Sequence, residues 1–305
     1  MAATFTPTTN AVAIPTIIAQ QTIKQLKGYL NLARTVAKDS DFEKNFTVGD
    51  TLTITKPGTL VAQRKTPGTA KSTQNATATK VSVTLDQHWY VSFTEEDITK
   101  MLQKPDLQAD YAQSAAIALA EKIEGFLLDL HTTMTNTDTF NSSTEANAVA
   151  SMLRLRSFFS RNKIPTGEQR FAYFDTSVID KLLSYERFTR LDATGKAEGL
   201  MDGSISRLYG INIFESQMVP TTGSPVAYHN LAYTRNAMVL VNRPMPLDGN
   251  GRGVKQSLFT DPDTGVVLRL TEAYDKDNMG VEMTMDVLFG GLVVDNRRVI
   301  EVESF

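Results

Sequence analysis

The sequence predicts an α+β fold with a long two-stranded arm, and three observations predict it. Apolar and polar residues alternate with a period of two in residues 51–55 and again from Val81, which is typical of strands. Apolar residues recur at helical spacing in residues 107–134. Helical and strand patterns then alternate over residues 145–220, as they do in α+β proteins.

Composition narrows the class of protein. The chain has 305 residues, of which 41% are hydrophobic and 21% charged, so one large core or two intertwined domains are both expected possibilities. It has no cysteine, which excludes disulfides, thiolate metal sites and a cysteine nucleophile. A formal net charge of −3 lacks the excess of Lys and Arg that strong binding to nucleic acid requires.

The N-terminal region predicts a polar segment followed by a helix. Residues 1–15 are Thr-rich, contain two prolines and cannot bury a core of their own. In residues 16–37 apolar positions recur at helical spacing, with Thr16 as the N-cap. No basic residue precedes Lys24, so we expect no secretory signal, and no apolar run approaches the roughly 20 residues that span a bilayer.

Two strand patterns and a polar segment between them predict the arm. Leu52 and Ile54 alternate with threonines in the first pattern, which ends at Pro57 and Gly58. Residues 66–80 are polar and show no hydrophobic period. About 35 residues in two strands reach on the order of 55 Å at roughly 3.3 Å per residue. Because an isolated hairpin is at best marginally stable in water, this arm needs a surface to lie on.

Charge is segregated in the arm. Between residues 50 and 86 the chain has no acidic residue, although its overall charge is negative. The basic residues of this segment are Lys56, Arg64, Lys65, Lys71 and Lys80. We expect them to face an acidic surface, for which the candidates are Glu95, Glu96, Asp97, Asp106 and Asp110. We predict these near the starts of two helices, one capped by Thr94 and one beginning at Pro105.

The longest predicted element is a helix over residues 105–135, about 45 Å long at 1.5 Å per residue. Its helically spaced apolar residues are Leu107, Tyr111, Ala115, Leu119, Ile123, Phe126, Leu130 and Met134. Gly125 inside it costs about 1 kcal/mol relative to alanine, so we expect a slight bend or a close packing contact there.

The remaining elements follow a linker at residues 136–147. A helix is predicted through Met152, Leu155 and Phe159, then a strand at residues 170–174 and a helix at residues 176–183. Three further strand patterns lie at residues 266–274, 281–294 and 297–302. We expect these C-terminal strands to return and close a core.

No residue pattern predicts a catalytic, cofactor-binding or metal-binding site. His88, His131 and His229 lie far apart and match no ligand spacing, so we predict packing or surface roles for them. P-loop and GxSxG sequences are absent. We therefore expect no enzyme, no cofactor and no metal.

Four phrases in a fixed order give the chain a family resemblance. They are VGDTLTITKPG from Val48, SVTLDQHWYVSFTEEDI from Ser82, GINIFESQMVP from Gly210 and VLFGGLVVDNRRVIEV from Val287. The ordered set resembles the major capsid proteins of tailed double-stranded DNA bacteriophages with the HK97-type fold. That fold has an N-terminal arm, an extended E-loop, a peripheral domain with a long spine helix, and an axial domain. By position the resemblance implies an N-arm at 1–46, the E-loop at 47–93, the peripheral domain with its spine helix at 94–140, the axial domain at 141–262 and C-terminal strands at 263–305 that return to the peripheral domain.

The resemblance also implies a function. It implies a coat protein that self-assembles into pentamers and hexamers of an icosahedral shell enclosing double-stranded DNA, located in the virion and in the host cytoplasm during assembly. The implied partners are other copies of the chain, a portal protein, a decoration protein and weakly held genomic DNA. A separate scaffolding protein is expected because the sequence has no room for a cleaved scaffolding segment. The alternatives are an encapsulin-like compartment shell and, from other classes, an enzyme or a soluble binding or tail protein.

Overall fold

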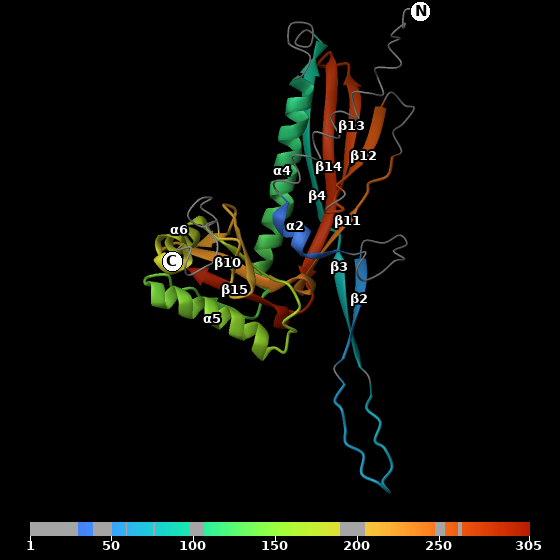
Figure 1. Cartoon of the computed structure of the whole chain (residues 1–305). Helices are drawn as coiled ribbons and strands as arrows, with labels where there is room; N and C mark the ends of the chain where they lie inside the picture. The colour runs from blue at the N-terminus through green and yellow to red at the C-terminus, as the bar shows by residue number, and fades with distance from the viewer. Residues whose placement is uncertain are drawn as a thin grey trace, which may run out of the picture.

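The structure is a computed structural model, and it describes residues 30–38, 51–58, 60–75, 77–97, 107–189, 205–247, 254–261 and 264–305. The described strands form a six-stranded sheet, a seven-stranded sheet and a separate two-stranded ribbon. In Figure 1 the six-stranded sheet and helix α4 form an elongated body, and the seven-stranded sheet with α5 and α6 forms a lateral body beside it. None of the helices in the described part of the chain is long and apolar enough to cross a membrane.

The elongated body is built on strand β14 (Gly280–Val293), the longest strand of its sheet. The other strands are β1 (Ala37–Lys38), β4 (Gln87–Glu96), β11 (Met238–Arg243), β12 (Val254–Thr260) and β13 (Val267–Asp275). Helix α4 (Leu107–Asp129) lies along the sheet and shares one apolar core with it, where Phe126 packs edge-on against Phe289 at 5.4 Å between ring centroids. The predicted long helix is therefore confirmed over these residues, and its predicted start at Pro105 lies outside the described residues.

The lateral body confirms the predicted alternation of helices and strands. Its strands are β5 (Thr137–Thr139), β6 (Arg170–Phe174), β7 (Arg207–Leu208), β8 (Ile211–Glu215), β9 (Thr221–Thr222), β10 (Ala227–Thr234) and β15 (Val299–Ser304). Its helices are α5 (Glu145–Arg161), α6 (Thr176–Ser184) and α7 (Glu186–Thr189). Met152, Leu155 and Phe159 of α5, predicted as its apolar positions, are buried in a second core.

The strands of the two bodies do not divide at residue 262, where we expected the axial domain to end. Strands β11 and β12 precede that position but pair in the six-stranded sheet, and β15 follows it but pairs with β10 in the seven-stranded sheet. Among the described residues, the chain crosses between the two bodies at three short 3-10 turns, η2 (Leu130–Thr133), η3 (Arg235–Ala237) and η4 (Asn296–Arg298). The expectation that all C-terminal strands return to one body is wrong for β15, because local periodicity identifies a strand but not its partner.

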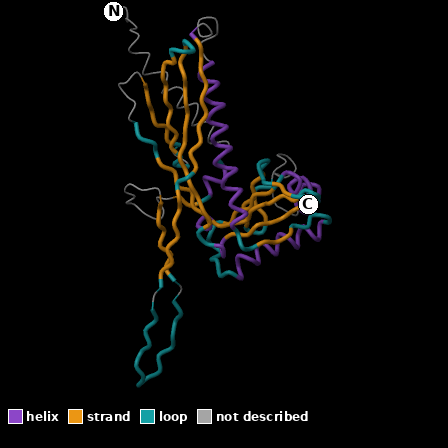
Figure 2. The backbone as a smooth tube through the Cα atoms, turned by 180° about the vertical axis from the view of Figure 1, so that it is seen from behind, coloured by secondary structure: helices purple, strands orange, loops and turns teal. Residues whose placement is uncertain are grey.

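The arm consists of β2 (Thr51–Pro57), β3 (Ala78–Thr84) and the loop between them. The two strands are antiparallel, with Thr51 opposite Thr84 and Pro57 opposite Ala78. Figure 2 shows that the ribbon and its loop project away from both sheets. The single strand predicted from Val81 is two strands, since β3 ends at Thr84 and β4 begins at Gln87 to pair with β14.

Three predicted details need correction or fall outside the described residues. Thr94 does not cap a helix, because residues 94–96 continue β4 and their backbone pairs with β14 as far as Gly280. We expected a slight bend or a close contact at Gly125, and the close contact is absent, since a Cβ there would meet only Met218 Cε at 3.7 Å. Of the predicted N-terminal helix, the described residues include α2 (Asn31–Thr35), which ends before β1. The predicted cap Thr16 lies outside them.

Candidate inter-subunit surfaces

The loop of the arm is exposed along its whole described length. All described side chains in residues 60–80 are exposed, and the apolar side chains of Leu60 and Val61 are exposed by 66% and 70%. The amide side chain of Gln74 holds the two sides of the loop together, because its Oε1 accepts a hydrogen bond from the backbone N–H of Val61 at 3.0 Å. Two neighbouring exposed apolar side chains on a projecting loop indicate a surface that another molecule can cover.

Four of the five predicted basic residues lie on this exposed part of the arm. Arg64, Lys65 and Lys71 are in the loop, and Lys80 is in β3. Lys56 differs, because its Nζ lies 3.0 Å from Oδ1 of Asp295 in the same subunit. Lys56 therefore lies at the base of the arm, and its role toward a neighbour stays a prediction.

Asp295 is the centre of a charged network at that base. It also accepts hydrogen bonds from Nε and Nη2 of Arg297 at 3.1 and 2.9 Å, and Nε of Arg298 lies 3.4 Å from its Oδ2. Arg298 in turn pairs with Glu168 of the lateral body. Burial raises the pKa of Asp295, but the hydrogen bonds from Arg297 and Lys56 outweigh it and lower that pKa to about 2. Asp295 therefore remains charged at neutral pH and connects the arm to both bodies.

A small apolar core also fixes the base of the arm. Ile54 of β2 and Val83 of β3 are buried against Val239 and Val241 of β11. Both side chains are therefore buried within their own subunit. Among the described residues of the arm, the exposed large apolar side chains are those farther out, at Leu60 and Val61.

The acidic candidates lie at the opposite end of the elongated body. Strand β4 runs away from the arm and α4 begins at that far end (Figure 1). Glu96, Asp97 and Asp110 are exposed there and Glu95 is half-buried, while Asp106 lies outside the described residues. Asp97 accepts a hydrogen bond from the hydroxyl of Tyr274 at 2.9 Å. Basic and acidic surfaces at opposite ends cannot meet within one subunit, which suits a head-to-tail contact between copies.

Glu124 anchors α2 to helix α4. Its Oε1 accepts a hydrogen bond from the backbone N–H of Leu32 at 2.7 Å, and its Oε2 accepts one from Ala33 at 3.4 Å. Burial raises the pKa of Glu124 to about 7, and the two backbone hydrogen bonds oppose that rise. No motif in the sequence indicates this contact, because its partners are separated by 92 residues.

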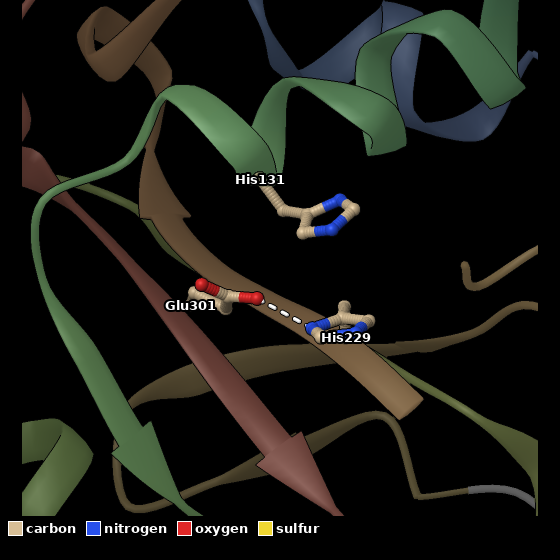
Figure 3. Close-up of side chains that lie close together, drawn as sticks. All are labelled: His131, His229 and Glu301. Atoms are coloured by element: carbon tan, nitrogen blue, oxygen red, sulfur yellow. Dashed lines mark hydrogen bonds and ion pairs between the residues drawn. The ribbon is translucent and has the colours of Figure 1, made fainter. Parts of the chain in front are cut away.

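The fold also brings together two of the histidines for which we predicted packing or surface roles. His131 in η2 (Leu130–Thr133) and His229 in β10 are buried and stacked, with ring centroids 4.4 Å apart. Nδ1 of His229 lies 2.6 Å from Oε1 of Glu301 in β15, as Figure 3 shows. The third histidine, His88, is in β4 and contacts Asp286. Sequence spacing could not have revealed the cluster, since its three residues come from three distant segments.

Comparison with known families identifies the class of protein. Residues 19–243 match the sequence profile of a family described as phage capsid protein. The chain belongs to the phage capsid protein family. A search of curated proteins found no match for this capsid protein.

Solved structures agree with the family. The capsid protein is similar to a chain of Mycobacterium phage Che8, with 20% identity over 84% of this chain and 85% of that chain and a TM-score of 0.63. It is similar to a chain of the capsid of cyanophage P-SCSP1u, with 13% identity over 88% and 86% and a TM-score of 0.64. A virus-like particle from Pyrococcus furiosus gives 8% identity over 93% and 97% and a TM-score of 0.55.

These comparisons confirm the predicted α+β, HK97-like fold and the predicted function of a major capsid protein. Phage capsid proteins are structural proteins that form homo-oligomeric capsomers, and they are located in the virion. The encapsulin-like alternative is less supported, because the family match is to phage capsid proteins.

Proposed function

We propose that this major capsid protein assembles into pentamers and hexamers of an icosahedral shell around double-stranded DNA, and that the arm sets the register between neighbouring copies. The observation that supports this is the separation of charge along one subunit. The exposed end of the arm is basic, and the far end of the elongated body has exposed acidic residues. Such a subunit has complementary surfaces at its two ends, as a ring of heterologous contacts requires.

Electrostatics alone would not hold such a contact. Exposed ion pairs are worth about 0.2–1 kcal/mol each, so the arm's cations direct and align the contact more than they stabilise it. Burial of Leu60 and Val61 would add roughly 25 cal/mol for each Å² of apolar surface removed from water. Because every copy makes the same contact, weak individual contacts become strong around a closed shell.

We further propose how the family's parts map onto the chain. The elongated body with α4 corresponds to the peripheral domain and its spine helix, the lateral body to the axial domain, and the arm to the E-loop. Residues 1–46 correspond to the N-arm, of which residues 30–38 are described. The proposed partners are a separate scaffolding protein, a portal protein, a decoration protein and DNA held by weak, non-specific contact, with assembly in the host cytoplasm. The net charge of −3 supports weak contact with DNA.

Reversing the arm's charge tests the proposal. The triple variant Lys65→Glu, Lys71→Glu, Lys80→Glu should fold normally but form few shells, as counted by electron microscopy after co-expression with a scaffolding partner. The matched control, with arginine at the same positions, keeps the charge and should assemble like the wild type.

A charge swap makes the test more specific. Adding Glu96→Lys, Asp97→Lys and Asp110→Lys to the reversed arm should restore part of the assembly, since the two surfaces would again be complementary. Normal shells from the charge-reversed variant alone would contradict the proposed role of the arm.

A further inference from the structure

Three buried side chains with nitrogen and oxygen donors converge where the elongated body meets the lateral body. His131 comes from η2, directly after α4, while His229 and Glu301 come from the paired strands β10 and β15. The residues are exposed by only 7–8%, and their potential ligand atoms all lie within 4.8 Å of one another. Figure 3 shows His131 above the sheet, facing the other two side chains.

Charge at this position is incompletely balanced. Within the described residues, the ion-pair partner of the buried Glu301 carboxylate is His229, and no Lys or Arg contacts it. A buried carboxylate is costly unless a cation compensates it. A bound cation at this position would compensate it. Two imidazoles and one carboxylate are a common donor set for Zn²⁺, which binds His₂Glu in several proteins.

The hydrogen bonds of His131 present a lone pair for such an ion. Nδ1 of His131 lies 3.1 Å from the backbone oxygen of Leu128, so the ring donates its Nδ1 proton to that carbonyl. The other nitrogen, Nε2, is then an acceptor, and no described residue donates to it. A histidine that donates one ring N–H to a backbone carbonyl is the usual arrangement of a metal ligand.

His229 is held in a comparable way. Its Nε2 lies 2.6 Å from Oγ1 of Thr222, which can accept a hydrogen bond from that N–H group. Its Nδ1 is then available to an ion placed between it and Glu301. Ligand bonds of about 2.0–2.2 Å require the nitrogen and oxygen to move apart from 2.6 Å to roughly 3.4 Å. The imidazole planes are 18° apart, so one ring must also turn for both lone pairs to reach one ion.

We propose that Nε2 of His131, Nδ1 of His229 and Oε1 of Glu301 bind one divalent transition-metal ion, with Zn²⁺ as the favoured occupant. The ion would replace the proton shared by His229 and Glu301. It would tie the end of the spine helix to β10 and β15, and so fix the angle between the two bodies. This inference does not depend on the proposed contacts of the arm.

Metal content of the full-length protein tests the site. The purified chain is stripped with a chelator, dialysed against buffer containing micromolar Zn²⁺ and analysed by mass spectrometry for metal. We expect one ion per chain, and with Co²⁺ in place of Zn²⁺ we expect visible absorption bands of a tetrahedral site. His131→Gln should weaken the affinity at least about 10-fold.

His88→Gln is the matched control, because His88 is the remaining histidine of the chain and lies in β4 outside the cluster. It should keep the ion. Zn²⁺ should also raise the thermal unfolding midpoint of the wild type and of His88→Gln, and should raise that of His131→Gln less, since an ion that binds only the folded state stabilises it in proportion to its affinity. The proposal is overturned if the wild type binds no stoichiometric ion, as expected for a proton-sharing pair, or if His131→Gln binds as tightly as the wild type.

Discussion

Replacing Glu124 with glutamine should change how the stability of the subunit depends on pH. The Glu124 side chain is buried, with the residue exposed by only 4%, and its carboxylate accepts hydrogen bonds from the first turn of α2. Burial raises its pKa from the ordinary 4.5 to about 7, against the effect of hydrogen bonds from Leu32 and Ala33. The folded subunit therefore holds a proton that the unfolded chain releases between these two pH values.

The sign and the size of the effect follow from this shift. The contribution of Glu124 to stability is greatest below about pH 4.5, falls as the pH rises to about 7, and is constant above that. At about 1.4 kcal/mol per pKa unit, the loss amounts to about 3 kcal/mol. Glu124→Gln keeps an oxygen that can accept from Leu32 but has no charge to desolvate. The variant should match the wild type at pH 4.5 and exceed its free energy of unfolding by up to about 3 kcal/mol at pH 8.

Urea unfolding of the dissociated subunit, followed by circular dichroism from pH 4.5 to 8, measures this difference. Glu121→Gln is the matched control, because Glu121 lies one turn earlier on the same helix and is exposed. The control should follow the wild-type curve. If Glu124→Gln also runs parallel to the wild type over the whole pH range, the carboxylate does not change protonation on folding and the reasoning fails.

Two further predictions concern the base of the arm. Asp295→Asn should lower the free energy of unfolding by roughly 1–2 kcal/mol at pH 7. The lowered pKa of about 2 means that the Asp295 carboxylate stabilises the folded state above about pH 4. This stabilisation is lost as the pH falls toward 2. Acid and urea titrations measure it, and equal stability at pH 7 would contradict it. Gly290→Ala should cost about 3 kcal/mol or more, because its Cβ would lie 2.1 Å from the backbone oxygen of Thr84. Gly167→Ala, with nothing within 4 Å, should change the thermal midpoint little, and similar losses from both variants would refute the packing argument.

Sequence by itself determined the local elements and the distribution of charge. Helical spacing predicted α4 and α5, and the period of two predicted both strands of the arm, because these patterns depend only on which residues face one core. The basic segment could be read directly, since charge counts need no coordinates. The helix predicted to begin at Thr94 was wrong. A capping pattern and a strand alternation overlap there, and pairing with β14 makes these residues part of β4.

Only the tertiary structure decided which distant residues meet. In the structure Lys56 forms an ion pair with Asp295, the backbone N–H of Leu32 donates a hydrogen bond to Glu124, and β15 lies in the lateral body. It also stacks His131 on His229, the pair on which the proposed metal site depends. Periodicity records which way a side chain points relative to its own helix or strand, whereas these contacts depend on the packing of elements that lie far apart in the chain. The proposed metal site therefore depends on how the two bodies pack against each other, which the sequence alone does not give.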